Sequence, residues 1–222
     1  MMSLLDKAYN NHLNFIVALD GPSASGKGHI GSLIAEEFSL TYVSSSIMYR
    51  GLAYICLQEK IAVNDETRII ELSQNTDIIS RTKGVDLNVE IIGEFASKIS
   101  VLSQVRQNLG FYLKKLIKTT PRIIMEGRDI GTVVAPNADL KIFITASAEV
   151  RAIRRYKQLL MAGKDCILSD VLDLLRSRDE RDISREVAPL VPATDACIID
   201  TTNLTTDQVV QKIKDIVSKS LL

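Results

Sequence analysis

Four short, mainly apolar runs divide the chain, and each has the length of a strand buried on both faces of a sheet. The first, Phe15-Ile-Val-Ala-Leu19, leads directly into a glycine-rich segment, and the others occupy residues 122–126, 140–145 and 196–200. Runs without polar alternation are typical of parallel strands that are covered on both sides. We therefore expect them to build a parallel sheet.

Between these runs, hydrophobic residues recur at helical spacing. The segment after the glycine-rich stretch shows the pattern at Ile30, Leu33, Ile34 and Phe38. Further helices are predicted around residues 47–56, 94–118, 149–161 and 169–182, with a closing helix that carries Val209, Val210, Ile213 and Ile216. Strands that alternate with amphipathic helices predict an α/β fold whose parallel sheet is covered by helices on both faces.

A different pattern interrupts this alternation near the middle of the chain. Residues 77–81 and 85–91 flank Lys83-Gly84, a pair suited to a tight turn. The pattern predicts a small hairpin, which we expect to form an insert beside a binding site.

Composition narrows the class of protein. Hydrophobic residues make up 46% and charged residues 24%, as in an ordinary globular protein, and 27 Lys and Arg balance 27 Asp and Glu. A general nucleic-acid binder would carry a basic surplus, so we expect no nucleic-acid partner. No apolar run reaches the roughly 20 residues of a membrane span, and residues 1–12 are too polar for a secretory signal.

The cysteines agree with a reducing compartment. Cys56, Cys166 and Cys197 are scattered, odd in number and without CxxC spacing, so neither a disulfide framework nor a zinc site is expected. We expect three reduced thiols among apolar neighbours, and a cytoplasmic protein.

The glycine-rich segment carries the most specific chemistry. Residues 21–27, Gly-Pro-Ser-Ala-Ser-Gly-Lys, fit the G-x-x-x-x-G-K part of a P-loop and lie between a predicted strand and helix, where that motif belongs. Backbone N–H groups and the helix N-terminus suit phosphate oxygens, and Lys27 can bridge the β- and γ-phosphates. The alternative is a glycine turn that only caps a helix. The usual next residue, Ser or Thr, is replaced by Gly28, which His29 follows.

Two arginine clusters follow later in the chain. The first is Arg151, Arg154 and Arg155, and the second places Arg178, Arg181, Asp182 and Arg185 on one helical face. Such charges often form solvated salt bridges on a surface helix. Arginine rather than lysine in both clusters favours phosphate binding instead, because the planar guanidinium grips phosphate oxygens in pairs.

A third group of charges follows the second apolar run. Gly127-Arg128-Asp129 stands where a strand of an open α/β sheet ends, and ligands bind beyond such ends. We expect Arg128 and Asp129 to face a ligand cleft, the alternative being a turn whose charges face water.

With these pieces assembled, the chain from about Phe15 onward resembles the bacterial cytidylate kinases, a family of nucleoside monophosphate kinases. The resemblance rests on Asp20–Gly28, on Tyr49-Arg50, and on residues 127–134, 178–182 and 188–193. The Gly-Arg-Asp-x-Gly-Thr-Val and Ala-Pro-Leu-x-Pro-Ala blocks are the specific part, since a P-loop alone occurs in many families.

The resemblance implies a transfer of the γ-phosphoryl group of ATP to CMP or dCMP, with Mg²⁺ accompanying the ATP and no covalent intermediate. The implied catalytic residues are Lys27, Arg128, Arg154 and Arg185. The implied ATP-binding residues are Gly21, Pro22, Ser23, Ala24, Ser25, Gly26, Lys27, Gly28 and His29. The implied acceptor residues are Ser97, Arg106 and Asp129 for the base, Arg178 and Asp182 for the ribose, and Ser45, Arg50, Arg128 and Arg185 for the phosphate. No residue is assigned as a direct metal ligand.

We interpret residues 1–222 as one P-loop kinase domain. Its core would comprise residues 15–60 and 119–222, with a helical lid near 150–166, and the acceptor-binding insert would comprise residues 61–118. We expect a monomer without a membrane partner. The alternatives are a kinase for another acceptor, such as UMP or AMP, and a P-loop module that binds nucleotide without turning it over.

The sequence departs from the family pattern at three places, and the first two motivate the alternative of a nucleotide-binding module without turnover. The family's Lys-Gly-Thr is Lys27-Gly28-His29 here, which removes a hydroxyl near the phosphates and the metal. The family's Asp-Ser-Gly is Ser44-Ser45-Ser46, which removes a carboxylate near the acceptor. The segment between Arg50 and Ser97 is shorter and lacks the usual Ile-Arg-Thr, so we expect a differently shaped acceptor insert.

Overall fold

The computed structural model describes residues 14–220, and the start of the chain, where no secretory signal was predicted, lies outside this range. The strands are β1 (Phe15–Asp20), β2 (Thr41–Ser44), β3 (Arg122–Gly127), β4 (Leu140–Thr145) and β5 (Cys197–Asp200). The helices are α2 (Lys27–Glu37), α3 (Ser46–Gln58), α4 (Glu66–Asn75), α5 (Ile78–Arg81), α6 (Glu90–Ile99), α7 (Ser103–Thr119), the π-helix η1 (Ile130–Val134), α8 (Ala148–Met161), α9 (Leu168–Ser184) and α10 (Thr206–Ser220).

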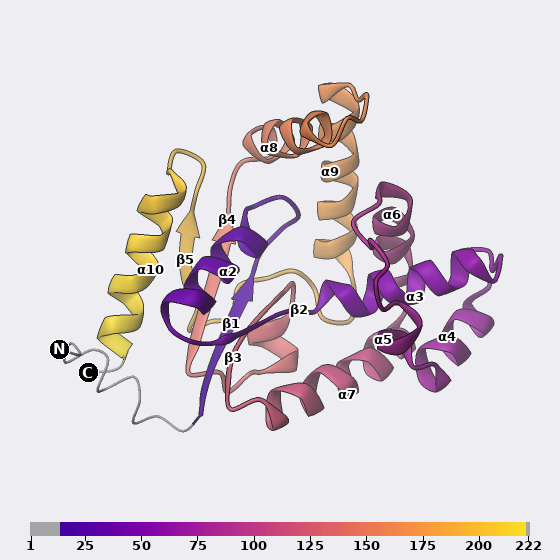
Figure 1. Cartoon of the computed structure of the whole chain (residues 1–222), viewed down its shortest axis with the longest axis horizontal. Helices are drawn as coiled ribbons and strands as arrows, with labels where there is room; N and C mark the ends of the chain where they lie inside the picture. The colour runs from indigo at the N-terminus through magenta and orange to yellow at the C-terminus, as the bar shows by residue number, and fades with distance from the viewer. Residues whose placement is uncertain (1–13, 221–222) are drawn as a thin grey trace.

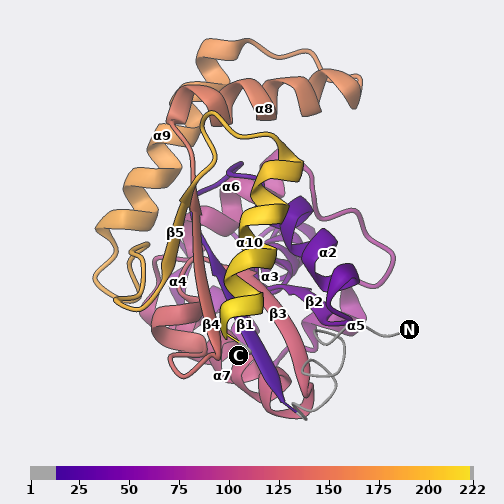
Figure 2. The same cartoon turned by 90° about the vertical axis from the view of Figure 1, so that its left-hand side faces the viewer.

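The five described strands form one sheet in the order β2-β3-β1-β4-β5, and every neighbouring pair is parallel. Each of the four apolar runs became a strand of this sheet, so the predicted α/β fold is confirmed. The runs are mainly apolar because helices cover both faces of the sheet, as Figures 1 and 2 show.

Alternate side chains of β1 belong to separate cores on the two faces. Val17 and Leu19 pack in the cluster that includes residues of α2 and α10, whereas Ala18 packs in the cluster built with α3, α4, α6 and α7. The period of two along a strand produces this division. Both cores are buried, so the sheet forms a rigid base for the loops at its carboxyl edge.

Helices α8 and α9 lie beyond that carboxyl edge, where β4 leads upward into α8 (Figure 1). Their contact has its own small apolar cluster of Ala152, Val171 and Leu175, against which Ala24 of the glycine-rich segment packs. The predicted lid residues are thus joined directly to the predicted phosphate loop.

The predicted hairpin is wrong. Asp77 starts the short helix α5 instead, where its carboxylate accepts a hydrogen bond from the Ser80 N–H at 3.1 Å. Ile78 is buried close to Gly51 of α3, where an added Cβ would stand 2.4 Å from the Ile78 side chain. Residues 82–89 form no strand. Capping by aspartate and packing on α3 outweighed the turn signal at Lys83-Gly84 on which the prediction rested.

The single helix predicted over residues 94–118 is two helices. Helix α6 ends at Ile99 and α7 starts at Ser103, with Leu102 extended between them. The Ser100 hydroxyl donates to the Ser97 carbonyl at 2.8 Å, and the Ser100 carbonyl accepts from Arg106 at 3.1 Å. The break lets Arg106 turn back toward the sheet.

None of the helices described within residues 14–220 is long and apolar enough to cross a bilayer.

Candidate functional site: a phosphate loop facing a ring of arginines

Residues 21–26 form a loop between β1 and α2, and Lys27 and Gly28 begin α2, as the P-loop pattern predicts. Gly21 has φ 147°, and a Cβ there would stand 1.9 Å from the Ile144 carbonyl oxygen. Gly26 has φ 97° and precedes the first residue of α2. Both positions therefore require glycine. The N-terminus of α2 points into the space that the loop encloses, where it can bind an anion.

Lys27 is the first residue of α2 and is buried. Its ammonium donates to the Pro22 carbonyl at 2.7 Å and lies 3.4 Å from the Ser25 hydroxyl. Burial, together with the nearby Arg128 guanidinium, lowers the pKa of Lys27 to about 7. A phosphate that enters the loop would therefore raise the pKa of Lys27 and stabilise its charged form.

The loop opens into a cleft of about 900 Å³. Residues 23–30 line one side, while Gly21 and Pro22 are buried and do not line the cleft. Arg154 of α8 lines it as well, and its guanidinium donates to the hydroxyl and the carbonyl of Thr201 at 3.0 and 2.7 Å. His29 lines the cleft and is exposed.

A second, narrower pocket of about 70 Å³ adjoins the cleft. All nine predicted acceptor residues line it, and they come from α3, α6, α7, α9 and the segment between β3 and η1. They are Ser45, Arg50, Ser97, Arg106, Arg128, Asp129, Arg178, Asp182 and Arg185. Arg50, Arg128 and Arg178 line both spaces, so three guanidiniums separate the phosphate loop from the acceptor pocket.

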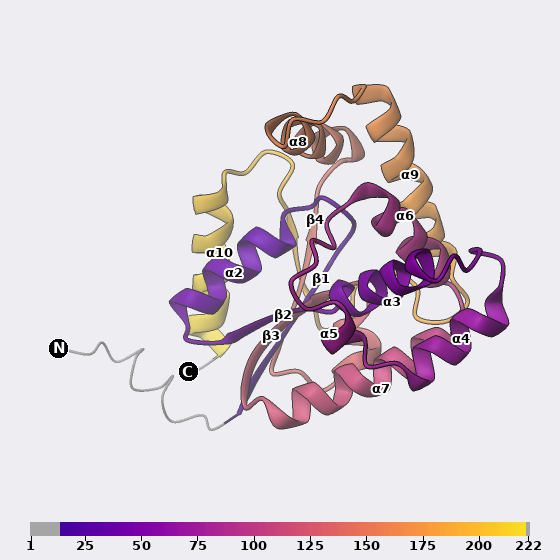
Figure 3. The same ribbon diagram turned by 45° about the vertical axis from the view of Figure 1, so that its right-hand side comes forward.

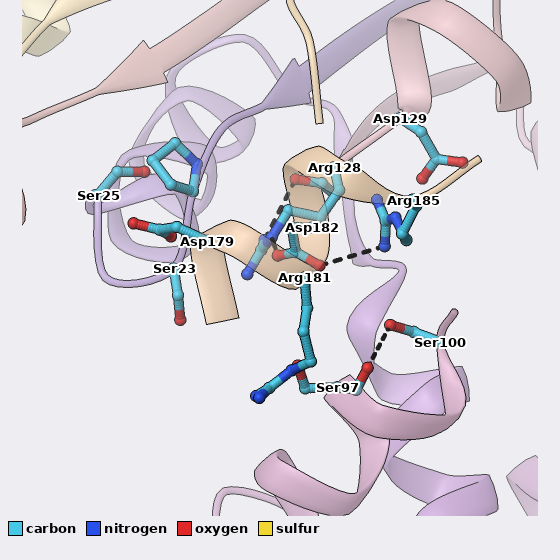
Figure 4. A network of polar contacts seen from close by, with 12 residues as sticks. Ser23, Ser25, Ser97, Ser100, Arg128, Asp129, Asp179, Arg181, Asp182 and Arg185 are labelled. Atoms are coloured by element: carbon cyan, nitrogen blue, oxygen red, sulfur yellow. Dashed lines mark hydrogen bonds and ion pairs between the residues drawn. The ribbon is translucent and has the colours of Figure 1, made fainter. Parts of the chain in front are cut away.

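Asp182 organises two of the pocket's arginines (Figure 4). One of its oxygens accepts from Arg128 Nε at 2.9 Å and the other from Arg185 Nη1 at 3.2 Å. The carboxylate is buried, which alone would raise its pKa, but Arg128 and Arg185 hold that pKa below its usual value. Asp182 is therefore an anion that fixes both guanidiniums.

The far end of the pocket holds a second buried ion pair. Arg106 Nη2 donates to Asp129 Oδ2 at 2.5 Å, and its guanidinium lies over the Tyr49 ring, 5.5 Å from the centroid. Arg106 Nε and Arg185 Nε are buried without a hydrogen-bond partner among the described residues. A buried guanidinium N–H without a partner is costly, and a ligand that accepts from both would remove that cost.

Asp20 at the end of β1 links the phosphate loop to this pocket. It accepts from the Ile130 and Gly131 N–H groups at 2.8 and 2.7 Å, at the start of η1. Burial raises the pKa of Asp20 to about 6, against the lowering effect of those hydrogen bonds. Asp20 thereby fixes the backbone that carries Arg128 and Asp129. The position of Asp20 directly before the glycine-rich loop is visible in the sequence, but the N–H groups that donate to its carboxylate are not.

A carboxylate that the sequence analysis missed lies beside Gly28. Glu126 accepts from the Ser44 hydroxyl at 2.6 Å, and its Oε2 would be 3.8 Å from a Cβ added at Gly28. Ser44 also shares a hydrogen bond with Ser46 at 2.8 Å. Glu126 from the neighbouring strand thus supplies a carboxylate on the side of the phosphate-loop cleft, although it does not line the acceptor pocket.

The first arginine cluster divides among three environments. Arg151 is buried, pairs with Asp179 at 2.6 Å and donates to the Ser23 carbonyl at 3.1 Å, so it braces the loop rather than facing the cleft. Arg154 faces the cleft, and Arg155 pairs with Glu90 on α6. Arg181 of the second cluster turns to Glu94, with both contacts at 3.0 Å.

Opposite the phosphate-binding loop, Arg50, Arg128, Arg178 and Arg185 form a ring of buried and partly buried guanidiniums, which we call the arginine ring. The two walls define a P-loop phosphotransferase, because each wall suits a separate anionic substrate. The fold agrees: a gluconokinase from Sinorhizobium meliloti superposes with a TM-score of 0.50, covering 95% of this chain and 92% of that one, at 15% identity.

Sequence comparison is more specific. Residues 17–219 match the family model described as cytidylate kinase. The chain is 56% identical over 219 residues to the cytidylate kinase of Rickettsia bellii, covering 99% of this chain and 100% of that one. It is 54% identical over 213 residues to that of Rickettsia canadensis, covering 96% of each. The chain belongs to the cytidylate kinase family, as the motifs predicted.

Proposed function

We propose that the chain transfers the γ-phosphoryl group of ATP to CMP or dCMP, with ADP and CDP or dCDP as products. The observation that carries this proposal is the shared wall of Arg50, Arg128 and Arg178 between the phosphate-loop cleft and the acceptor pocket. Two substrates placed on either side of it bring their phosphates together. Family membership supports the choice of a cytidine acceptor.

ATP would bind with its phosphates in the loop of residues 21–28. Backbone N–H groups and the α2 N-terminus would bind the β-phosphate, and Lys27 would leave the Pro22 carbonyl to bridge the β- and γ-phosphates. Arg154 would close over the γ-phosphate from α8, in the lid that we assign to residues 150–166. Excluding water there protects ATP from hydrolysis.

CMP would occupy the narrow pocket, in the insert that we assign to residues 61–118 together with the arginine ring. Cytosine offers an N4 amine that donates, and N3 and O2 that accept. Asp129 would accept from the amine, and the Nε of Arg106, which lacks a partner, would donate to the ring. Ser97 would complete the contact with the base.

The acceptor's ribose and phosphate would lie nearer the phosphate loop. Arg178 and Asp182 would meet the ribose, and Ser45, Arg50, Arg128 and Arg185 would bind the phosphate. Arg128 and Arg185 would orient the attacking oxygen because Asp182 holds both. That oxygen is already ionised at neutral pH, so catalysis comes from positioning and charge stabilisation without a general base.

Mg²⁺ fits this site as a companion of ATP. Within residues 14–220 no cluster of three or more His, Cys, Asp or Glu side chains could hold a metal without substrate. Mg²⁺ is usually held by one or two carboxylates together with phosphate oxygens and water. Glu126, with the Ser44 hydroxyl beside it, supplies such a carboxylate next to the phosphate loop. Bound there, the ion would offset charge on the β- and γ-phosphates.

We place this activity in the cytoplasm, in a monomer, with ATP and CMP or dCMP as its small-molecule partners. The three free cysteines, with Cys56 buried, are consistent with a reducing compartment.

Base selection tests the proposal. Asp129→Asn keeps the shape of the side chain but offers N–H to the uracil O4 and loses the charge that attracts the cytosine amine. We expect the ratio of kcat/KM for CMP over UMP to fall by about 10- to 100-fold, the loss of one charged hydrogen bond. Coupled ADP-release assays with each nucleotide measure it.

Glu180→Ala, an exposed change on α9, is the matched control and should leave the ratio unchanged. An unaltered ratio in Asp129→Asn would remove Asp129 from the base site. ATP binding without any CMP-dependent ADP release in the unmodified chain would contradict phosphotransfer itself.

A further inference from the structure

One carboxylate, Glu90, stands among three arginines from three other elements. It lies in the first turn of α6 and forms an ion pair with Arg155 of α8. Its other oxygen is 3.7 Å from Arg178 Nη1 of α9, and Arg50 of α3 lies close enough to act on its charge. Glu90 therefore links the acceptor insert, which contains α6, to the lid helix α8 and to α9.

These groups lie at the junction of the ligand spaces. All four line a cavity of about 450 Å³ that the segment between α8 and α9 also lines. Arg50 and Arg178 additionally line the cleft and the acceptor pocket. Figure 3 shows α6 next to α9, with α8 beyond the carboxyl edge of the sheet. The carboxylate thus lies beside Arg178, which faces the place where two phosphate chains must meet, and it pairs with Arg155 of the lid in the adjoining cavity.

Electrostatics explains why an anion is needed there without substrate. Burial lowers the pKa of Arg50 to about 10, and the neighbouring Arg178 and Arg155 charges add to that lowering while Glu90 opposes it. Burial would raise the pKa of Glu90, but Arg155 and Arg178 hold it below its usual value. Glu90 offsets the mutual repulsion of the arginines until a stronger anion arrives.

Phosphate is the stronger anion for these groups. A guanidinium makes paired, charge-assisted hydrogen bonds to phosphate oxygens. The distance from Glu90 Oε1 to Arg178 Nη1 is 3.7 Å, which is too long for a hydrogen bond. Phosphates and Glu90 compete for the same cations. Displacing Glu90 also opens the Arg155 contact, which joins α6 to the lid helix α8.

We propose that Glu90 is a positioning residue, an internal counter-anion that holds Arg155 of the lid and Arg178 of the cleft while no substrate is bound. An incoming nucleotide takes its place, with phosphates binding Arg155 and the acceptor binding Arg178. The proposal rests on the proposed phosphate-binding function of the arginine ring. It predicts that Glu90 opposes nucleotide binding, although it stabilises the arginines of the empty chain.

Glu90→Gln tests this, with Glu94→Gln as the matched control. Glu94 lies one turn further along α6 and pairs with Arg181 of α9, which lines neither the cleft nor the acceptor pocket. Both variants remove an α6–α9 charge contact, but only Glu90→Gln also removes the ion pair with Arg155 of α8 and the anion beside the cleft residue Arg178. We expect the Kd for ATP, measured by titration calorimetry, to fall roughly three- to tenfold in Glu90→Gln and to stay within about twofold in Glu94→Gln.

Glu90→Asp keeps the charge and should return the ATP Kd toward that of the unmodified chain. Equal or weaker ATP binding in Glu90→Gln would overturn the proposal, because a purely structural brace weakens binding when it is lost. CMP-dependent ADP release is measured in the same preparations. Its absence from the unmodified chain would count against the phosphotransfer function, whereas normal release with an unchanged Glu90→Gln Kd would count against this inference alone.

Discussion

Replacing Lys27 with Met should lower kcat for ATP-dependent phosphorylation of CMP by about 10³-fold, the scale of removing one preorganised charge from a phosphoryl-transfer site. Methionine keeps the length of the side chain and removes only the ammonium. The ammonium is buried at the start of α2 and is the cation that the loop itself brings to the β- and γ-phosphates. Steady-state kinetics with both substrates saturating isolate the effect on kcat. Lys114→Met, an exposed change on α7, should leave kcat unaltered.

The pH dependence separates the charge of Lys27 from its shape. Burial and Arg128 lower its pKa to about 7 in the empty chain, and phosphate oxygens raise it again. At pH 8 the lysine is largely neutral before ATP binds, so binding should take up a proton, and ATP affinity should fall as the pH rises from 7 to 9. Calorimetry in buffers of different ionisation enthalpy measures the uptake. Persistence of the uptake in Lys27→Met would assign the proton to another group.

Replacing Asp182 with Ala should lower the free energy of unfolding by about 3–5 kcal/mol, the cost of leaving buried charges without their partner. Asp182 is the shared partner of Arg128 and Arg185, both held within 3.2 Å. Their guanidiniums would remain buried near each other with no anion between them. Urea denaturation followed by circular dichroism measures the change.

The matched control is Asp173→Ala, an exposed carboxylate on the same helix, for which we expect a change within about 0.5 kcal/mol. Adding CMP should restore part of the stability of Asp182→Ala, since its phosphate would replace the missing anion. A loss as small as that of Asp173→Ala would mean that Asp182 does not hold the arginine ring.

The elements that the sequence revealed are those whose pattern is set by complete burial. Residues 15–19 are apolar at every position because helices cover both faces of β1, and that requirement is visible in a single segment. The edge strand β2, Thr41–Ser44, pairs only with β3 and is partly exposed, so its sequence carries no comparable signal. The hairpin was predicted wrongly because short segments on either side of a turn pair such as Lys83-Gly84 do not distinguish two strands from a capped helix packed on its neighbour.

The candidate site divides in a similar way. Glycine positions depend on local backbone geometry, so the phosphate loop at residues 21–28 could be named from its own pattern, whereas the acceptor arginines were named from the resemblance to the family. Asp179 and Glu90, which pair with Arg151 and Arg155 of the first arginine cluster, lie 28 residues or more away from them along the chain. Only the folded chain brings them together, and helical spacing alone did not distinguish the buried Arg151 from the cleft-facing Arg154.

The most direct test of the central claim, that one arginine wall serves both substrates, is a crystal structure with CMP and a non-hydrolysable ATP analogue. We expect the CMP phosphate within hydrogen-bond distance, about 3 Å, of Arg50 and Arg128, the cytosine amine against Asp129, and the analogue's γ-phosphate facing the CMP phosphate from the loop of residues 21–28. A complex in which CMP lies outside this pocket, or in which Arg50 and Arg128 point to solvent while both nucleotides are bound, would contradict it.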